Sequence, residues 1–295
     1  MKRPLITAED LQQSPDMVIP VGARLTPLAQ DLLRKRGAVV RGRGAMPLAR
    51  RLLIANWKSY KTVGEACEFA RALGERVRPP TALQLVICPP FTALATLGEA
   101  LRGVAELGAQ DLSPHDEGAH TGEVAARHLL DVGCSYALVG HSERRAAGEG
   151  DALVATKLER ALAAGLRPVL CVGETAEERA AGRAEAVVST QLGRALANTR
   201  PTDLPRVVVA YEPRWAIGKG VTPTSAEIAG ILGHVRHSLR QMAPEVAERV
   251  SVLYGGSVSP DNAGEILALE DCNGALVGGA ALDPVRFSAI LAAGS

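Results

Sequence analysis

The chain has 295 residues, 47% of them hydrophobic, which is enough to bury one large core and excludes a disordered protein or a disulfide miniprotein. Its 33 Lys and Arg residues offset 32 Asp and Glu residues, so the net charge of +1 provides no field that would recruit nucleic acid or a membrane. The five cysteines are scattered along the chain and are expected to be reduced thiols. With no apolar stretch of transmembrane length and no signal-peptide pattern, we expect a soluble, cytoplasmic protein.

The first 50 residues differ in pattern from the rest of the chain. Residues 7–10 form a capping-box pattern, and Thr26-Pro27 followed by spaced leucines and Gly37 predicts a short amphipathic helix. Residues 1–51 carry ten Lys or Arg against four Asp or Glu, and residues 41–45 have the composition of a flexible linker. We therefore predict an N-terminal helical extension over residues 1–50 and a separate domain over residues 51–295.

Eight short apolar runs recur from residue 51 onward and predict strands. They lie at 52–56, 83–88, 104–109, 136–140, 168–172, 207–211, 250–254 and 275–277. The segments between them show helical periodicity, as in Val154, Leu158 and Leu162. Eight strand–helix units predict an α/β protein with a single closed (β/α)8 barrel. A doubly wound open sheet is the alternative, but it does not usually need eight such regular units.

Three charged or titratable residues follow predicted strands, at the end of a barrel where active sites lie. Glu212 ends the most hydrophobic strand, which suits a general base at the edge of a dry pocket. Lys58 would attract an anionic substrate, and His141 precedes a helix start that disfavours a second proton on the ring. Taken singly, each has an ordinary alternative: a solvated lysine, a structural histidine or a structural ion pair.

Two further patterns point to a small phosphorylated ligand. Residues 213–220 place Trp215 between a proline and two glycines, which suits a loop that closes over a ligand. Gly255-Gly256-Ser257 and Gly278-Gly279 follow the seventh and eighth strands, where barrel enzymes bind phosphate with backbone N–H groups. Together the residues predict proton transfer beside the carbonyl of a small sugar phosphate. No metal or nucleotide motif is present, so we expect neither a metal nor a cofactor.

Six motifs then stand in order along the chain. They are Asn56-Trp57-Lys58, Gly140-His141-Ser142-Glu143-Arg144-Arg145, Cys171-Val172-Gly173-Glu174, Ala210-Tyr211-Glu212-Pro213 with Trp215-Ala216-Ile217-Gly218, Tyr254-Gly255-Gly256-Ser257-Val258, and Leu276-Val277-Gly278-Gly279-Ala280. In this combination, residues 51–295 resemble the triosephosphate isomerase family. The resemblance implies a cofactor-independent isomerase of glycolysis and gluconeogenesis that interconverts D-glyceraldehyde 3-phosphate and dihydroxyacetone phosphate.

The resemblance also implies residue roles. Glu212 would move the proton between C1 and C2, neutral His141 would polarise the carbonyl, and Lys58 would supply positive charge, with Asn56 and Glu143 in support. Asn56 and Lys58 would also bind substrate. The implied phosphate-binding residues are Gly218, Ser257, Gly278 and Gly279. The implied lid consists of Pro213, Trp215, Ala216, Ile217 and Gly218.

The family resemblance implies a homodimer in which residues 118–123 insert into the neighbouring copy, so that Thr121 reaches the site around Asn56. Arg214 and Lys219 stand where the family usually has Val and Thr, and His120 and Asp111 replace the usual Phe and Asn. The two lid changes favour, as an alternative, an isomerase of another ketose phosphate such as a tetrulose phosphate. A non-catalytic sugar-phosphate binder is a further alternative, although a binder has no need of a base.

The N-terminal extension carries a second resemblance. Residues 21–33, followed by Arg36-Gly37, are similar to an N-terminal segment of some ethanolamine-utilisation and other bacterial microcompartment proteins. This similarity implies a segment that docks a microcompartment shell or cargo partner through Leu28, Leu32 and Leu33, and a location within the microcompartment. The alternatives are a helix packed on the chain's own barrel and a disordered basic tail.

Overall fold

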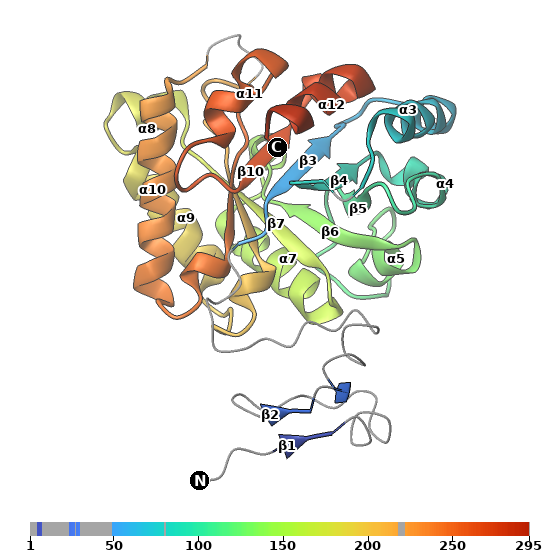
Figure 1. The fold of residues 1–295 in the computed structure, drawn as a ribbon. Helices are drawn as coiled ribbons and strands as arrows, with labels where there is room; N and C mark the ends of the chain where they lie inside the picture. The colour runs from blue at the N-terminus through green and yellow to red at the C-terminus, as the bar shows by residue number, and fades with distance from the viewer. Residues whose placement is uncertain are drawn as a thin grey trace. The chain divides into compact units, whose positions relative to one another are not determined.

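The computed structural model describes residues 5–7, 24–26, 28–29, 49–79, 81–217 and 222–294. The chain divides into two compact units, Met1–Leu48 and Ala49–Ser295. The second unit is a ring of parallel strands surrounded by helices (Figure 1).

The N-terminal unit contains a strand pair that the sequence patterns did not predict. Strand β1 (Leu5–Ile6) pairs in parallel with β2 (Arg24–Leu25). Two-residue strands are too short to show a period, so no pattern of hydrophobic residues indicates them. Leu28 and Ala29 are helical, and the Ala29 N–H donates to Oγ1 of Thr26 over 3.3 Å, as the N-cap pattern predicts. The rest of the predicted helix, with Leu32 and Leu33, lies outside the described residues, as do residues 8–10 and the predicted linker at 41–45.

Eight parallel strands close the barrel in the order β10-β3-β4-β5-β6-β7-β8-β9. Their bounds are β3 Leu52–Asn56, β4 Gln84–Cys88, β5 Glu106–Ala109, β6 Cys134–Val139, β7 Arg167–Val172, β8 Val208–Tyr211, β9 Ser251–Tyr254 and β10 Gly274–Val277. The barrel closes where β10 pairs with β3, from Gly274 opposite Leu52 to Val277 opposite Ala55. The predicted (β/α)8 barrel is confirmed, and the open sheet is wrong because the sheet has no edge strands.

Helices connect the strands on the outside of the barrel (Figure 1). The α-helices are α3 Val63–Arg76, α4 Leu94–Ala100, α5 Ala126–Asp131, α6 Ser142–Ala146, α7 Asp151–Ala164, α8 Ala176–Ala180, α9 Ala184–Leu196, α10 Ser225–Met242, α11 Pro260–Leu267 and α12 Pro284–Ala293. Short 3-10 turns lie at η1 Phe91–Ala93, η2 Leu204–Arg206, η3 Ala247–Arg249 and η4 Gly279–Leu282. Capping boxes begin α3 at Thr62, α8 at Thr175 and α10 at Thr224, which satisfies N–H groups that have no partner within the helix.

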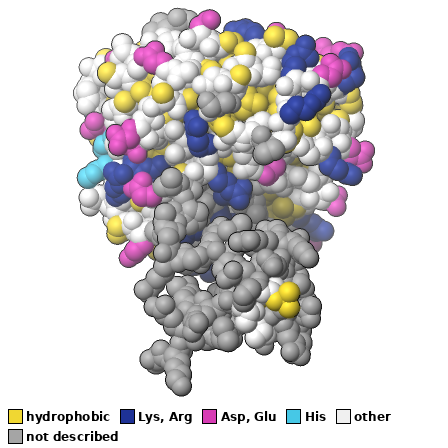
Figure 2. All heavy atoms as spheres, viewed as in Figure 1, with side chains coloured by type: hydrophobic (Ala, Val, Ile, Leu, Met, Phe, Trp, Pro, Cys, Tyr) yellow, Lys and Arg dark blue, Asp and Glu magenta, His cyan; other side chains and the backbone are white. Residues whose placement is uncertain are grey.

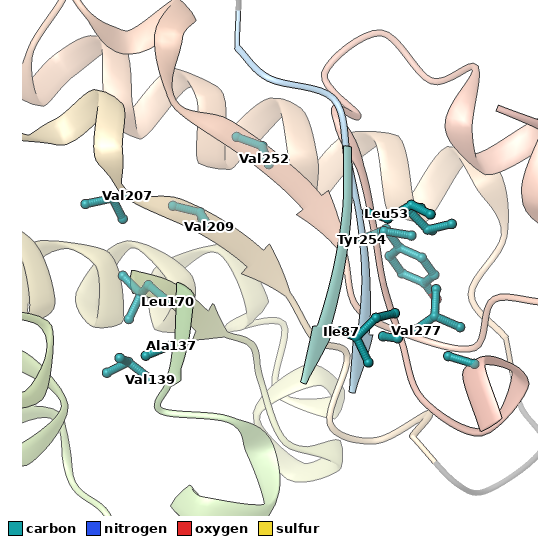
Figure 3. Close-up of a cluster of buried hydrophobic side chains, with 14 of the residues drawn as sticks. Leu53, Ile87, Ala137, Val139, Leu170, Val207, Val209, Val252, Tyr254 and Val277 are labelled. Atoms are coloured by element: carbon teal, nitrogen blue, oxygen red, sulfur yellow. The ribbon is translucent and has the colours of Figure 1, made fainter. Parts of the chain in front are cut away.

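Both faces of the barrel strands are buried, which explains why the strands are continuously apolar rather than alternating. In β3, Leu52 and Ile54 belong to the cluster that fills the barrel interior. Leu53 and Ala55 belong instead to the layer between strands and helices, where Leu53 joins Ile87, Val209 and other outward-facing side chains (Figure 3). A packed interior leaves the strand ends as the place for a site.

The surface carries charges of both signs. On the face shown in Figure 2, Lys and Arg side chains are interspersed with Asp and Glu. Within the described ranges, no helix has both the length and the hydrophobicity needed to cross a membrane. All five cysteines are free, as expected from their scattered positions, and four of them are buried.

Candidate active site

The barrel gathers most of the predicted site residues at the C-terminal ends of its strands. Asn56 ends β3, Glu212 follows β8, Ser257 follows β9, and Gly278 and Gly279 follow β10. Together with Lys58 and His141 they line one cavity of about 430 Å³. This volume falls within the usual range for small-ligand sites.

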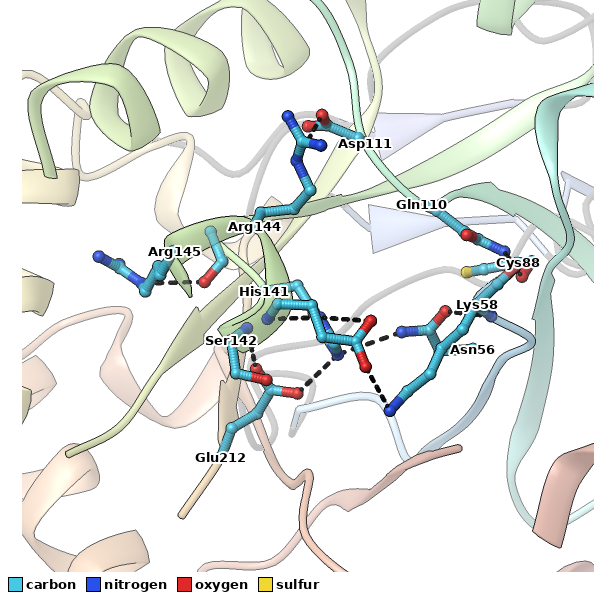
Figure 4. Close-up of polar contacts among 12 residues, drawn as sticks. Asn56, Lys58, Cys88, Gln110, Asp111, His141, Ser142, Arg144, Arg145 and Glu212 are labelled. Carbon is cyan, nitrogen blue, oxygen red and sulfur yellow. Dashed lines mark hydrogen bonds and ion pairs between the residues drawn. The ribbon is translucent and has the colours of Figure 1, made fainter. Parts of the chain in front are cut away.

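Glu212 is buried, with both carboxylate oxygens in hydrogen bonds. Oε2 accepts the backbone N–H of Ser142 over 2.9 Å, and Oε1 lies 3.0 Å from Nε2 of His141 (Figure 4). Burial raises the pKa of Glu212, but the charge and hydrogen bond of His141, the Ser142 N–H and the charge of Lys58 outweigh burial and hold this pKa below its ordinary value. The carboxylate is therefore ionised at neutral pH and able to accept a proton.

The backbone at Glu212 fits closely against the end of the neighbouring strand. A Cβ on Gly173, the residue after β7, would lie 1.8 Å from the carbonyl oxygen of Glu212. Gly173 is held in turn by the buried Gln191 of α9, whose Oε1 accepts its N–H over 2.8 Å and whose Nε2 donates to its carbonyl over 3.2 Å. The sequence patterns gave no role to Gln191, because a lone Gln on a helix carries no motif.

His141 is the N-cap of α6. Its Nδ1 accepts the backbone N–H of Glu143 over 3.2 Å, so the ring proton of the neutral tautomer lies on Nε2 and points toward Glu212. Burial lowers the pKa of His141, but the adjacent Glu212 carboxylate raises it, with a net upward shift. The expectation that the helix start disfavours a second proton on this ring is therefore not borne out in this arrangement, because the Glu212 carboxylate lies 3.0 Å from Nε2 and raises the pKa of His141.

Lys58 contacts Glu143 through its side chain and Asn56 through its backbone. Its Nζ lies 2.7 Å from Oε1 of Glu143, and its backbone N–H donates to Oδ1 of Asn56 over 3.0 Å (Figure 4). Nδ2 of Asn56 lies 3.2 Å from Nε2 of His141. The predicted cluster of Asn56, Lys58, His141, Glu143 and Glu212 is thus one connected group.

The described part of the predicted lid is anchored by a buried carboxylate. Nε1 of Trp215 donates to Oε1 of Glu174 over 2.8 Å, and the hydroxyl of Tyr211 donates to the same oxygen over 3.1 Å. Trp215 is half-buried, and the guanidinium of Arg179 lies 4.2 Å from the centre of its ring. Pro213 and Ala216 form a turn, and Ile217 reaches the cavity. Gly218 and Lys219 lie outside the described residues.

The predicted dimer loop, residues 118–123, lies within an exposed run of the chain. Residues 115–123 are all exposed, and the loop is closed at its base by the Ser113 N–H, which donates to the carbonyl of Val124 over 2.9 Å. The rings of His115 and His120 stack 3.8 Å apart. Thr121 lies in this exposed run and does not line the cavity of its own chain.

Two residues that line the active-site cavity were not predicted from the sequence. Tyr60 and Arg286 line the cavity, and both are exposed. Arg286 comes from α12, a helix without a motif, so only the closed barrel brings it to this mouth. Among the residues that the structure describes, no group of three or more His, Cys, Asp or Glu side chains is arranged to hold a metal ion.

Comparison with known proteins agrees with this geometry. Residues 51–294 match the family model described as triosephosphate isomerase. The chain belongs to the triosephosphate isomerase family. It is 46% identical to the triosephosphate isomerases of Roseiflexus sp. (strain RS-1) and Chloroflexus aurantiacus over 243 residues, which covers 81% of this chain and 96% and 97% of theirs. A relative of the same name from Nitratidesulfovibrio vulgaris (strain DP4) is 46% identical over 250 residues, 83% of this chain and 100% of its own length.

Membership of the triosephosphate isomerase family makes this protein an isomerase. The matched residues coincide with the barrel, which carries the whole cluster around Glu212. Residues 1–50 precede the match and have no counterpart in the family model.

Proposed function

We propose that the cluster around Glu212 catalyses the interconversion of D-glyceraldehyde 3-phosphate and dihydroxyacetone phosphate. The observation that carries this proposal is a buried, ionised carboxylate beside the Nε2 of His141, facing a cavity of about 430 Å³ in a member of the triosephosphate isomerase family. Such a pair suits proton abstraction next to a carbonyl.

In this proposal Glu212 removes a proton from one carbon of the substrate and returns it to the neighbouring carbon through an enediolate. The Nε2–H of His141 donates to the oxygens that become charged, and the ammonium of Lys58 stabilises the same negative charge. Two supports favour these roles. Nδ1 of His141 already accepts an N–H, which places the proton on Nε2, and Glu143 holds the Lys58 ammonium near the reacting group.

The substrate phosphate would bind to backbone N–H groups of Ser257, Gly278 and Gly279, joined by Gly218 when the lid closes. Gly278 and Gly279 begin the short η4 turn, and all three described residues line the cavity. Closure of residues 213–218 would exclude water and keep the enediolate phosphate from eliminating its phosphate.

The two alternatives are not favoured. A non-catalytic binder would not need a buried base placed 3.0 Å from a histidine nitrogen. An isomerase of a larger ketose phosphate has in its favour only Arg214 and Lys219 of the lid, of which Lys219 lies outside the described residues.

We further propose a homodimer in which Thr121 of one copy reaches the site of the other. The nine consecutive exposed residues of the loop support this proposal. A second cavity of about 190 Å³, lined by Asn56, Lys58 and the exposed Phe91, is a candidate receptor for the loop. Sedimentation of the Thr121→Arg variant would detect monomers if the loop occupies such a cavity, and unchanged dimers would contradict this placement.

The location of the protein also stays a proposal. We propose a cytoplasmic enzyme whose N-terminal unit docks a microcompartment shell or cargo partner through Leu28, Leu32 and Leu33. The support is the capped helical start at Thr26, with Leu28 68% exposed.

Deuterium exchange tests the proposed reaction directly. Dihydroxyacetone phosphate in D2O should yield D-glyceraldehyde 3-phosphate with deuterium at C2, detected by proton magnetic resonance, because the base exchanges its proton with solvent while the enediolate exists. Product without any deuterium would contradict exchange through Glu212, and absence of product would contradict the proposed reaction itself.

A further inference from the structure

Arg286 lines the active-site cavity from the first turn of its helix, where a cation is unfavourable. It is the third residue of α12, which begins at Pro284, shortly after the η4 turn that follows β10. Helical side chains lean toward the helix N-terminus, and this is the end of α12 at which Arg286 reaches the cavity. A cation in the first turn faces the positive end of the helix dipole, so this position costs the fold some stability.

No interaction within the described part of the chain offsets this cost. Arg286 is exposed, and its guanidinium forms no hydrogen bond or ion pair with any residue that the structure describes. The carboxylate of Asp283, three residues earlier, instead caps the helix, because its Oδ1 accepts the Val285 N–H over 2.8 Å. Arg286 therefore places an unpaired positive charge beside the cavity.

The other charges around the cavity do not favour the approach of an anion. Lys58, the other cation among the described cavity residues, is paired with Glu143 over 2.7 Å, and the carboxylate of Glu212 is ionised. Residues 52–295 contain 23 Lys or Arg against 28 Asp or Glu, so this part of the chain carries a net negative charge. A sugar phosphate with close to two negative charges is therefore repelled as it approaches, unless a local cation offsets these charges.

We propose that Arg286 recruits the anionic substrate: its unpaired guanidinium attracts the phosphate group to the mouth of the cavity and so raises the rate of association. The inference rests on the proposed function for the identity of the substrate, whereas the attraction of a phosphate anion stands without it. The bound phosphate is held by backbone N–H groups, so Arg286 acts on the encounter and not on the chemical step. Salt weakens the attraction, because the screening length is about 10 Å at 0.1 M ionic strength.

The kinetic test varies charge and salt together. Arg286→Gln removes the charge, and Arg286→Lys keeps it. Arg102→Gln is the matched control, because Arg102 is also exposed, has no side-chain partner among the described residues, and lies between α4 and β5 at the opposite end of the barrel. At about 10 mM ionic strength, kcat/KM of Arg286→Gln should fall by a factor of about three to ten with kcat unchanged, and the deficit should disappear near about 0.5 M salt. Arg286→Lys and Arg102→Gln should stay within about twofold of wild type.

Thermal unfolding and phosphate binding separate recruitment from a structural role. Removal of an unpaired cation from the first turn should leave the melting temperature of Arg286→Gln at or above that of wild type. Inorganic phosphate, titrated by calorimetry, should bind this variant several-fold more weakly in low salt and equally well in high salt. A lower melting temperature, a deficit that persists in high salt, or wild-type phosphate affinity in low salt would overturn the proposal. A wild-type protein that binds phosphate but shows no turnover would refute the proposed function, and the phosphate titrations would still decide the role of Arg286.

Discussion

At the scale of single residues, His141 shows how one backbone contact sets the chemistry of a side chain. The N–H of Glu143 occupies Nδ1, so the proton that faces the cavity must come from Nε2. The sequence predicted only that His141 directly precedes a helix start, and not which ring nitrogen accepts the N–H. The shared position of Glu212, between His141 and the Ser142 N–H, could not be predicted, since it depends on the pairing of β6 and β8 with β7.

Replacing His141 by Gln should lower kcat more than it weakens phosphate binding. The imidazole faces the reacting oxygens, so its loss should cost kcat a factor of about 10² to 10³, as for one donor of an oxyanion site. The dissociation constant of inorganic phosphate should change less than threefold by calorimetry. A variant that loses phosphate binding in parallel with kcat would mean that His141 holds the phosphate instead.

Lys157, Asp111 and Glu149 form a cluster of charged side chains whose contribution to folding stability can be measured. Nζ of Lys157 lies 2.6 Å from both Asp111 and Glu149, and Lys157 is only 3% exposed. Burial raises the pKa of Glu149, but hydrogen bonds and charges of Lys157 and Arg144 outweigh this effect and lower it. Because the folded pKa lies below the unfolded value, ionised Glu149 stabilises the fold above that unfolded value, about 4.3, and this stabilisation is lost as the pH falls through the folded pKa.

Glu149→Gln should therefore destabilise the protein by about 3 kcal/mol at pH 7, because it removes one partner of a buried charge. The deficit, measured by urea unfolding, should shrink below pH about 4.3, where wild type also loses the charge. Glu75→Gln is the control: it breaks an exposed pair with Arg71 and should cost less than about 1 kcal/mol. A Glu149→Gln deficit as small as that of the control would show that the cluster contributes little.

Among the secondary-structure elements, the eight barrel strands were predictable from the sequence, whereas the side-chain contacts at their C-terminal ends were not. Continuous apolar runs located all eight barrel strands to within two residues, because each strand is buried on both faces. β1 and β2 were missed because two residues show no period. The contact of Gln191 with Gly173 was also missed, since it joins a helix to a strand end 18 residues away.

Gly173→Ala tests the close approach of β7 and β8. The added Cβ would overlap the Glu212 carbonyl, so one strand end must move, and Glu212 with it. We expect a lower melting temperature and at least a hundredfold loss of kcat/KM. Gly230→Ala, in the exposed middle of α10 with open space around its Cβ, should instead stabilise the protein by about 1 kcal/mol and leave kcat/KM unchanged. Full activity in Gly173→Ala would mean that the site tolerates movement at this strand end.

At the scale of the whole molecule, the barrel contains every described residue of the candidate site. Unit Ala49–Ser295 includes its own closing contacts, such as the Ala49 N–H to the carbonyl of Glu248 over 3.0 Å. Deleting residues 1–48 should therefore leave kcat/KM within twofold of wild type and the melting temperature of the barrel unchanged. A collapse of activity on deletion would contradict a docking role and would make the N-terminal unit part of the catalytic machinery.

If Glu212 is the base of this triose-phosphate isomerase, turnover should depend on its carboxylate. The most direct measurement is kcat/KM of the full-length protein on D-glyceraldehyde 3-phosphate, beside the Glu212→Gln variant. We predict a value near the diffusional ceiling of about 10⁸ M⁻¹s⁻¹ for wild type. The variant should lose a factor of at least about 10³ while keeping its fold, because it lacks the proton acceptor. A wild-type value several orders of magnitude lower would contradict triose phosphate as the substrate, and a variant with unimpaired turnover would contradict Glu212 as the base.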